Sequence, residues 1–159
     1  MSIYLQCSLP WKGKPMHFVN KSSIVSRPSP LILIVEDNPT NLRLLRDVLR
    51  HYGYEVLEAA DGKQGVSMAI EHLPDLILMD IQMPVMDGFQ AGAILKNDPT
   101  TKHIKIIALT SFAMKGDRDR VMQSGFDDYI SKPIDTRGLP RIIELHLGTI
   151  VDRVITNNP

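Results

Sequence analysis

The sequence lacks the features of an oxidised, zinc-bound or polyanion-binding protein. Its 159 residues include one cysteine, Cys7, so an intrachain disulfide is impossible and a reducing, cytoplasmic location is expected. The five histidines show no zinc-site spacing. Basic and acidic residues balance at 18 each, so we expect no direct nucleic-acid partner. No apolar run approaches the roughly 18 residues of a transmembrane helix, and no membrane partner is expected.

Both ends of the chain differ from its middle. Residues 1–30 mix proline, serine and lysine with isolated apolar residues, without sustained periodicity, and predict a flexible N-terminal extension. Residues 149–159 are expected to form a short C-terminal tail, too short for a DNA-binding module. One domain is expected between them, at 31–148, with its output through protein–protein contacts.

Residues 31–148 alternate between short apolar runs and helical periodicity. Three of the apolar runs are nearly continuous, as in strands that are covered on both faces. The pattern therefore predicts a doubly wound α/β fold with a parallel sheet and right-handed crossovers. Strands are expected at 31–37, 54–59, 75–80, 104–110 and 127–133, and helices at 38–53, 62–73, 87–98, 115–125 and 139–148. Because Pro140 is tolerated only in a first turn, the last helix should begin near Gly138 or be kinked there.

Polar residues gather where the predicted strands end. Parallel α/β sheets bind ligands outside the carboxyl ends of their strands. The residues placed there are Glu36, Asp37, Asp80, Thr110 and, after the last strand, Lys132. Taken singly, an aspartate at a strand end is most simply a turn or cap residue (Asp37 could cap the first helix), and a lone lysine is a solvated one. Five such groups at one edge favour a functional site.

These residue types suit phosphoryl transfer. Two carboxylates about 5 Å apart repel by roughly 3 kcal/mol at an effective dielectric near 20, so a cluster of three requires a cation. Hard oxygen ligands in an open cluster favour Mg²⁺. An aspartate can serve as the nucleophile that forms an aspartyl phosphate. A lysine and a threonine hydroxyl would then hold the phosphoryl oxygens.

Four segments in order resemble the motifs of the response-regulator receiver domain of two-component signalling, which has the CheY-like fold: LILIVEDN, LILMDIQMPVMDG, IIALTSFAMKGD and DDYISKP. The resemblance covers about residues 31–148. It implies a flavodoxin-like, five-stranded parallel sheet in the order 2-1-3-4-5. Within the family, the residues of these segments resemble those of DivK-type single-domain regulators and of receivers attached to hybrid kinases.

The resemblance also implies a role for each site residue. Asp80 would accept a phosphoryl group from a sensor histidine kinase or a histidine phosphotransfer protein, and a downstream effector protein would read the result. The chain would be a switch, not an enzyme, with only self-catalysed phosphorylation and dephosphorylation. Mg²⁺ would be bound by Asp37, Asp80 and the backbone carbonyl of Gln82, with Glu36 acting directly or through water. Thr110 and Lys132 would contact the phosphoryl group, Thr110 and Tyr129 would form the switch, and the Lys132–Pro133 bond would be cis.

Other functions remain open at this stage. A haloacid-dehalogenase-like phosphatase would need a second acid two residues after its nucleophile, where Asp80 is followed by IQMP. A flavodoxin-like cofactor binder would need a phosphate loop where this chain has EDNP. A receiver used only as an unphosphorylated docking module would not need the full set of site residues. Tyr129 could be an ordinary edge-strand aromatic, and KGDRDR a solvated helix face.

Overall fold

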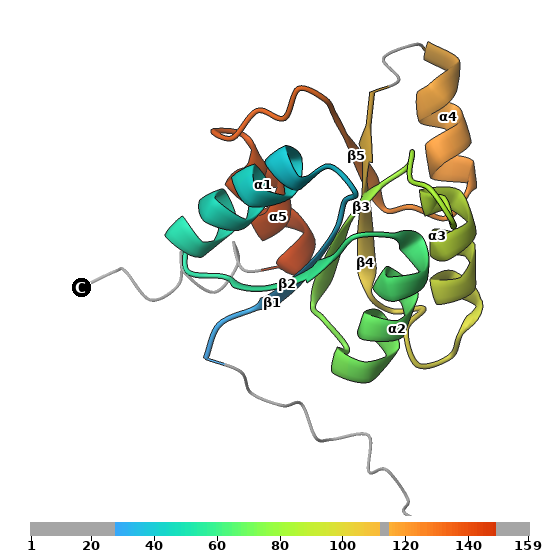
Figure 1. Cartoon of the computed structure of the whole chain (residues 1–159), viewed down its shortest axis with the longest axis horizontal. Coiled ribbons are helices and arrows are strands. Elements are labelled where there is room, and N and C mark those ends of the chain that lie inside the picture. Colours follow the sequence, from blue (N-terminus) through green and yellow to red (C-terminus); the bar gives the residue numbers. More distant parts are fainter. Residues whose placement is uncertain (1–27, 112–114, 149–159) are drawn as a thin grey trace, which may run out of the picture.

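Five strands alternate with five helices in the computed structural model, which describes residues 28–111 and 115–148 (Figure 1). The predicted extension and tail lie outside the described residues, apart from residues 28–30. The strands are β1 (Leu31–Val35), β2 (Glu55–Ala59), β3 (Leu76–Asp80), β4 (Lys105–Thr110) and β5 (Asp128–Ser131). The helices are α1 (Pro39–His51), α2 (Gly62–His72), α3 (Gly88–Asn97), α4 (Lys115–Gln123) and α5 (Leu139–Leu147).

The strands form one parallel sheet in the order β2-β1-β3-β4-β5, which confirms the predicted topology. Val35 pairs with Met79, and Asp80 pairs with Leu109. The carboxyl ends of β1, β3 and β4 therefore lie side by side. The first strand ends at Val35, two residues earlier than predicted, so Glu36 and Asp37 belong to the loop that follows it.

Helices cover both faces of the sheet. α1 and α5 lie on one face, and α2, α3 and α4 lie on the other (Figure 1). All five residues of β1 and all five of β3 are buried, as their unbroken apolar runs require. Alternate side chains of these strands enter two separate cores, because successive side chains of a strand point to opposite faces. None of the helices in the described ranges is long and apolar enough to cross a membrane.

Local sequence explains where the helices begin. The Asn38 side chain caps α1 by accepting hydrogen bonds from the N–H groups of the first turn, so Asp37 is not the cap. At α3, Asp87 and Gln90 form a capping box. α5 begins at Leu139, directly after Gly138, and Pro140 lies in its first turn. The predicted start of the last helix is therefore confirmed.

Asp127, directly before β5, joins three elements. Its carboxylate accepts hydrogen bonds from Lys96 of α3 at 2.7 Å, from Lys105 of β4 at 2.9 Å and from the Ile106 N–H at 3.0 Å. Burial acts to raise the pKa of Asp127, but the hydrogen bonds, that of Lys96 foremost, outweigh it, so the pKa lies below its ordinary value. The sequence placed Asp127 inside the last strand, whereas β5 begins one residue later.

Candidate functional site

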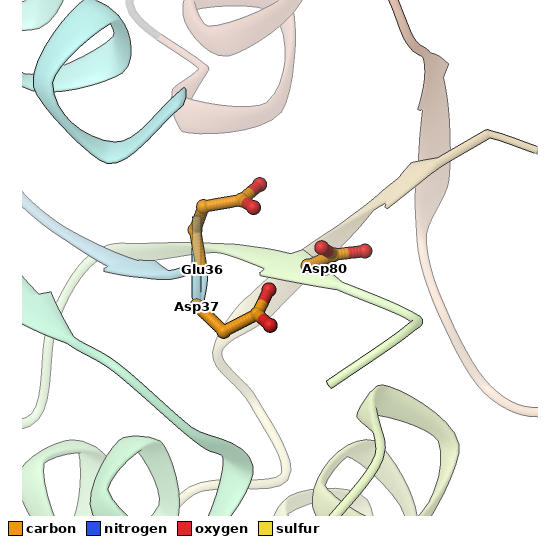
Figure 2. Close-up of side chains that lie close together, drawn as sticks. All are labelled: Glu36, Asp37 and Asp80. Atoms are coloured by element: carbon orange, nitrogen blue, oxygen red, sulfur yellow. The ribbon is translucent and has the colours of Figure 1, made fainter. Parts of the chain in front are cut away.

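Three carboxylates converge at the carboxyl edge of the sheet. Glu36 and Asp37 follow β1, Asp80 ends the neighbouring β3, and one oxygen from each lies within 4.8 Å of the others. Figure 2 shows the Glu36 and Asp37 side chains leaving the end of β1 in different directions while both extend to the side where Asp80 lies. Glu36 and Asp80 are buried, with 1% and 4% of their surface exposed, whereas Asp37 is exposed. The cluster is therefore open to solvent at Asp37.

Lys132 joins two of these acids. Its ammonium nitrogen lies 2.8 Å from Glu36 Oε2 and donates a hydrogen bond of 2.7 Å to Asp80 Oδ2. The lysine follows β5, and its backbone N–H donates to the Thr110 carbonyl at 2.7 Å. The Lys132–Pro133 bond is cis, as the resemblance implied. The sequence separated Lys132 from Asp80 by 52 residues, and the fold brings their side chains into contact.

The surroundings of Glu36 and Lys132 change the pKa of each. Burial raises the pKa of Glu36, more than the nearby Lys132 ammonium lowers it, and the charge of Asp80 adds to the rise. Burial alone would lower the pKa of Lys132. The hydrogen bond to Asp80 and the contact with Glu36 outweigh burial, so the pKa of the ammonium is raised. Lys132 is therefore held as a cation between the acids.

Backbone and asparagine donors hold the second carboxylate oxygen of Asp80 and of Glu36. Asp80 Oδ1 accepts a hydrogen bond of 3.0 Å from the Gln82 N–H. Glu36 Oε1 accepts from the Asn38 N–H at 3.2 Å and from Asn41 Nδ2 at 3.3 Å. Sequence reasoning missed the role of Asn41. The available signal was its place in the first turn of the helix that follows Glu36, which turns its amide back to that acid.

The donor set fits a hard divalent cation. Glu36 Oε2 is buried and has the Lys132 ion pair but no hydrogen bond of satisfactory geometry. Three carboxylates and one ammonium leave an excess of two negative charges at the cluster. Mg²⁺ prefers carboxylate oxygens and retains several waters, so a cluster with one exposed member suits it.

Thr110 and Tyr129 occupy different places relative to the acids. Thr110 ends β4 with 1% of its surface exposed, one residue beyond the Leu109 that pairs with Asp80. Tyr129 lies two residues before Ser131, the strand partner of Thr110, and packs partly buried against the core. The Tyr129 ring has the Arg118 guanidinium carbon 5.7 Å from its centroid. Residues 118–120 of KGDRDR are exposed, as a solvated helix face predicts, and one of them, Arg118, also covers an aromatic ring.

The loop between β3 and α3 forms the rim beside Asp80. The Gly88 N–H donates to the Ile81 carbonyl at 3.0 Å and closes the loop, and a Cβ on Gly88 would overlap the Asp80 carbonyl oxygen. Met83 is 9% exposed and belongs to the core, and Met86 packs against it. The loop is therefore fixed at its two ends and along its length.

Val85 is at the tip of this loop, in a strained conformation. The Met86 N–H donates to the Pro84 carbonyl at 2.8 Å, and the φ of Val85 is 70°. This is a γ-turn of the rare kind with a positive central φ. A β-branched residue in this region is an outlier that costs on the order of 1–3 kcal/mol. This turn could not be predicted from the residue types, because valine is among the least expected residues at a positive φ.

Comparisons with known proteins agree with the fold. The family model for the response regulator receiver domain matches residues 32–144. This chain belongs to that family. It is 48% identical over 113 residues to the polar-differentiation response regulator DivK of Brucella anthropi, covering 71% of this chain and 89% of the relative.

Two solved structures extend the comparison. The receiver domain of the sensor histidine kinase PA1611 from Pseudomonas aeruginosa, which has a magnesium ion coordinated in its active-site cleft, superimposes with a TM-score of 0.71 at 40% identity. The match covers 76% of this chain and 98% of that one. The receiver domain of Ssk1 from Saccharomyces cerevisiae, co-crystallised with the histidine phosphotransfer protein Ypd1, gives 0.69 at 29% identity, over 74% and 88% of the two chains. The chain is a receiver domain of two-component signalling, which decides against the flavin-binding alternative.

Proposed function

We propose that this receiver accepts a phosphoryl group on Asp80, in a Mg²⁺-dependent reaction, from a sensor histidine kinase or a histidine phosphotransfer protein. The observation that carries the proposal is the surroundings of Asp80. Its carboxylate ends a central strand, contacts Lys132 at 2.7 Å and lies within reach of two further acids. A structural aspartate at a strand end would need neither a half-buried ammonium in contact with it nor two acidic neighbours.

The transfer itself is a displacement at phosphorus. One oxygen of the Asp80 carboxylate forms a bond to the phosphorus as the bond to the donor's histidine nitrogen breaks. The bonding pair leaves with that nitrogen, which regains a proton from solvent, and the product is an aspartyl phosphate. Hydrolysis reverses the state: water attacks the phosphorus and releases inorganic phosphate and the Asp80 carboxylate.

The surrounding residues divide the work of binding and charge neutralisation. Glu36, Asp37, Asp80 and the Gln82 carbonyl would hold Mg²⁺, which would neutralise charge on the phosphoryl oxygens. Lys132 is already in contact with Asp80. Its ammonium would bind one of the phosphoryl oxygens and would be the second cation, beside Mg²⁺, that neutralises their charge. The buried Thr110 hydroxyl would donate to another. The magnesium-bound receiver of PA1611, at 40% identity, supports this assignment.

Phosphorylation would be read through Thr110 and Tyr129. The aspartyl phosphate adds negative charge and acceptor oxygens beside β4, and Thr110 would follow them inward. Tyr129, two positions before the residue that pairs with Thr110, would then move from its partly buried position under Arg118. The surface formed by α4, β5 and α5 would change, and a downstream effector protein would bind it.

Three further assignments belong to this proposal. The receiver unit spans 31–148, with residues 1–30 as an extension and 149–159 as a tail. The protein is a switch with self-catalysed phosphorylation and dephosphorylation and has no other enzymatic reaction. It works in the cytoplasm, which the single cysteine favours.

The decisive experiment labels the protein with a small phosphodonor. Wild type incubated with radiolabelled acetyl phosphate and Mg²⁺ should take up close to one phosphoryl group per chain, in an acyl phosphate that hydroxylamine cleaves. Asp80→Asn should take up none, because an amide oxygen is a poor nucleophile. Asp119→Asn, which changes an exposed acid of α4, is the matched control and should be labelled like wild type.

Undiminished labelling of Asp80→Asn would refute the assignment of the phosphoacceptor. Continued release of phosphate from a small phosphate ester, far beyond one turnover, would instead favour the phosphatase alternative. Wild-type labelling that is unaffected by removal of Mg²⁺ with a chelator would refute the metal requirement.

A further inference from the structure

Val85 has a strained backbone and an exposed apolar side chain, and neither stabilises the folded chain. Its backbone has a φ of 70°, where glycine or asparagine is far more stable. Its apolar side chain is 84% exposed, the largest fraction among the large exposed hydrophobic residues of the described chain. Packing within the chain therefore does not compensate for the strained turn. Observed strain of this kind is a reason to look for a function.

The rigid loop keeps the Val85 side chain outside the molecule. Pro84 and the Met86 N–H···O bond define the turn, and of the nearby methionines Met83 lies in the core and Met86 packs against it. A mobile tip would fold its apolar side chain inward or lose the turn. Here the valine is presented at a fixed place, without a large conformational entropy left to lose on binding.

That place is within the footprint of a protein that approaches Asp80. Val85 is three residues from Gly88, which touches the Asp80 carbonyl, so the chain length limits its distance from Gly88 to about 11 Å. A protein interface of standard size buries about 800 Å² per partner, a disc of about 16 Å radius. A macromolecule centred on the phosphoacceptor would therefore cover Val85.

We propose that Val85 is a docking residue for the phosphohistidine-bearing phosphotransfer protein that delivers the phosphoryl group to Asp80. The inference rests on the proposed function and names the surface through which the donor binds. Asp80 is 4% exposed, so a donor histidine reaches it only by closing over the loops at this edge. A downstream effector that reads α4, β5 and α5 has no need to cover the phosphoacceptor. The Ssk1 receiver, 29% identical, forms a complex with a protein of the proposed class.

The test compares two donors on the same variants. Acetyl phosphate reports the chemistry at Asp80 without docking. The protein donor is chosen by testing each phosphorylated histidine phosphotransfer domain of the source organism in a separate reaction. The domain that labels wild type fastest is used. For each donor, kcat/KM of labelling is measured, along with the melting temperature of each variant.

Val85→Gly should separate stability from docking. The variant relieves the strained φ and should raise the melting temperature by about 2–6 °C. It deletes the apolar side chain and should lower kcat/KM for the protein donor about tenfold. Labelling by acetyl phosphate should stay within about twofold of wild type. A role that is only structural would not lower transfer in a more stable protein.

Two variants complete the design. Val85→Leu keeps an apolar side chain and should retain transfer from the protein donor within about twofold. Leu73→Gly is the matched control, because Leu73 also has a positive φ, of 46°, and is 46% exposed, but lies after α2 at the opposite edge of the sheet. It should leave transfer from both donors unchanged.

Each other outcome counts against the inference. Unchanged transfer from the protein donor to Val85→Gly would overturn it, as would equal losses with both donors, which would place the effect on the chemistry at Asp80. Failure of every phosphotransfer domain to label a wild type that acetyl phosphate labels would overturn the choice of partner. Failure of acetyl phosphate itself would refute the proposed function instead.

Discussion

At the scale of single residues, Lys132 sets the charge balance of the site. It contacts two of the three acids and is held as a cation between them. A cation that enters the cluster is attracted by the acids and repelled by the lysine. The Mg²⁺ affinity of the acid cluster therefore measures how strongly the Lys132 ammonium repels the metal ion.

Lys132→Met should bind Mg²⁺ more tightly than wild type. At about 5 Å in a water-like dielectric, an ammonium repels a divalent cation by about 1.7 kcal/mol, which corresponds to roughly a twentyfold gain in affinity when the charge is removed. Isothermal titration calorimetry at fixed ionic strength measures the change. The same variant should be labelled more slowly by acetyl phosphate, since one ligand of the phosphoryl group is gone.

Lys105→Met is the control for this measurement. Lys105 pairs with Asp127 and not with the three acids, so its removal should leave Mg²⁺ affinity near the wild-type value. Equal or weaker Mg²⁺ binding by Lys132→Met would mean that the lysine supports the geometry of the acids more than it opposes the metal.

At the scale of elements, Asp127 holds α3 and the ends of β4 and β5 together. Its three hydrogen bonds, two of them from lysines, involve a carboxylate whose side chain is 18% exposed. An asparagine could keep the Ile106 N–H bond but would leave the Lys96 ammonium without its charged partner. That lysine is 20% exposed, so the loss is only partly screened by water.

Asp127→Asn should lower the free energy of unfolding by about 2–3 kcal/mol at pH 7. Because the pKa of Asp127 is lowered in the folded state, its contribution is fully present above the unfolded value, near 4, and is lost as pH falls through the folded value. The difference in the free energy of unfolding between wild type and Asp127→Asn should therefore become smaller only below about pH 4. Urea unfolding from pH 7 to pH 3 checks this.

The exposed Asp47→Asn, in a surface ion pair on α1, should change stability by less than about 0.5 kcal/mol at every pH. If Asp127→Asn and wild type became equally stable already above about pH 5, the lowered pKa of Asp127 in the folded state would be contradicted.

Elements also show how far sequence reasoning reached. Unbroken apolar runs predicted β1 and β3, and Pro140 located the start of α5, because burial and the missing proline N–H act locally. The gathering of Glu36, Asp37 and Asp80 at one edge of the sheet followed from the predicted topology alone. The Asp127 contacts and the Val85 turn were missed. The first joins residues far apart in sequence, and the second contradicts the preference of its own residue.

At the scale of the whole molecule, the three acids repel one another in the folded state, and Lys132 offsets only part of their charge. Glu36 and Asp80 come together only in the native state, so Mg²⁺ should bind that state and not the unfolded chain. At a concentration one hundred times its Kd, such a ligand stabilises by about 2.7 kcal/mol. For a chain of this size the melting temperature should rise by about 5–10 °C.

Scanning calorimetry with and without MgCl₂, at ionic strength matched with NaCl, measures this shift. Asp37→Asn should show a smaller shift, because one oxygen ligand of the cluster has lost its charge. A melting temperature that is indifferent to Mg²⁺ in wild type would contradict the metal site at the sheet edge.

The parallel sheet also separates the chemistry from the two ends of the described chain. Asp75 accepts the Leu31 N–H at the amino end of β1, and His146 of α5 lies 2.9 Å from Asp128 at the amino end of β5. Both ends therefore leave from the edge opposite Asp80, about 17 Å away along a five-residue strand. Fluorescent reporters fused at either end would leave the phosphodonor's approach open. Because Pro28 and Glu144 of α5 line the same pocket at this edge, residues 28 and 148 are also suited to being joined in a circular permutant.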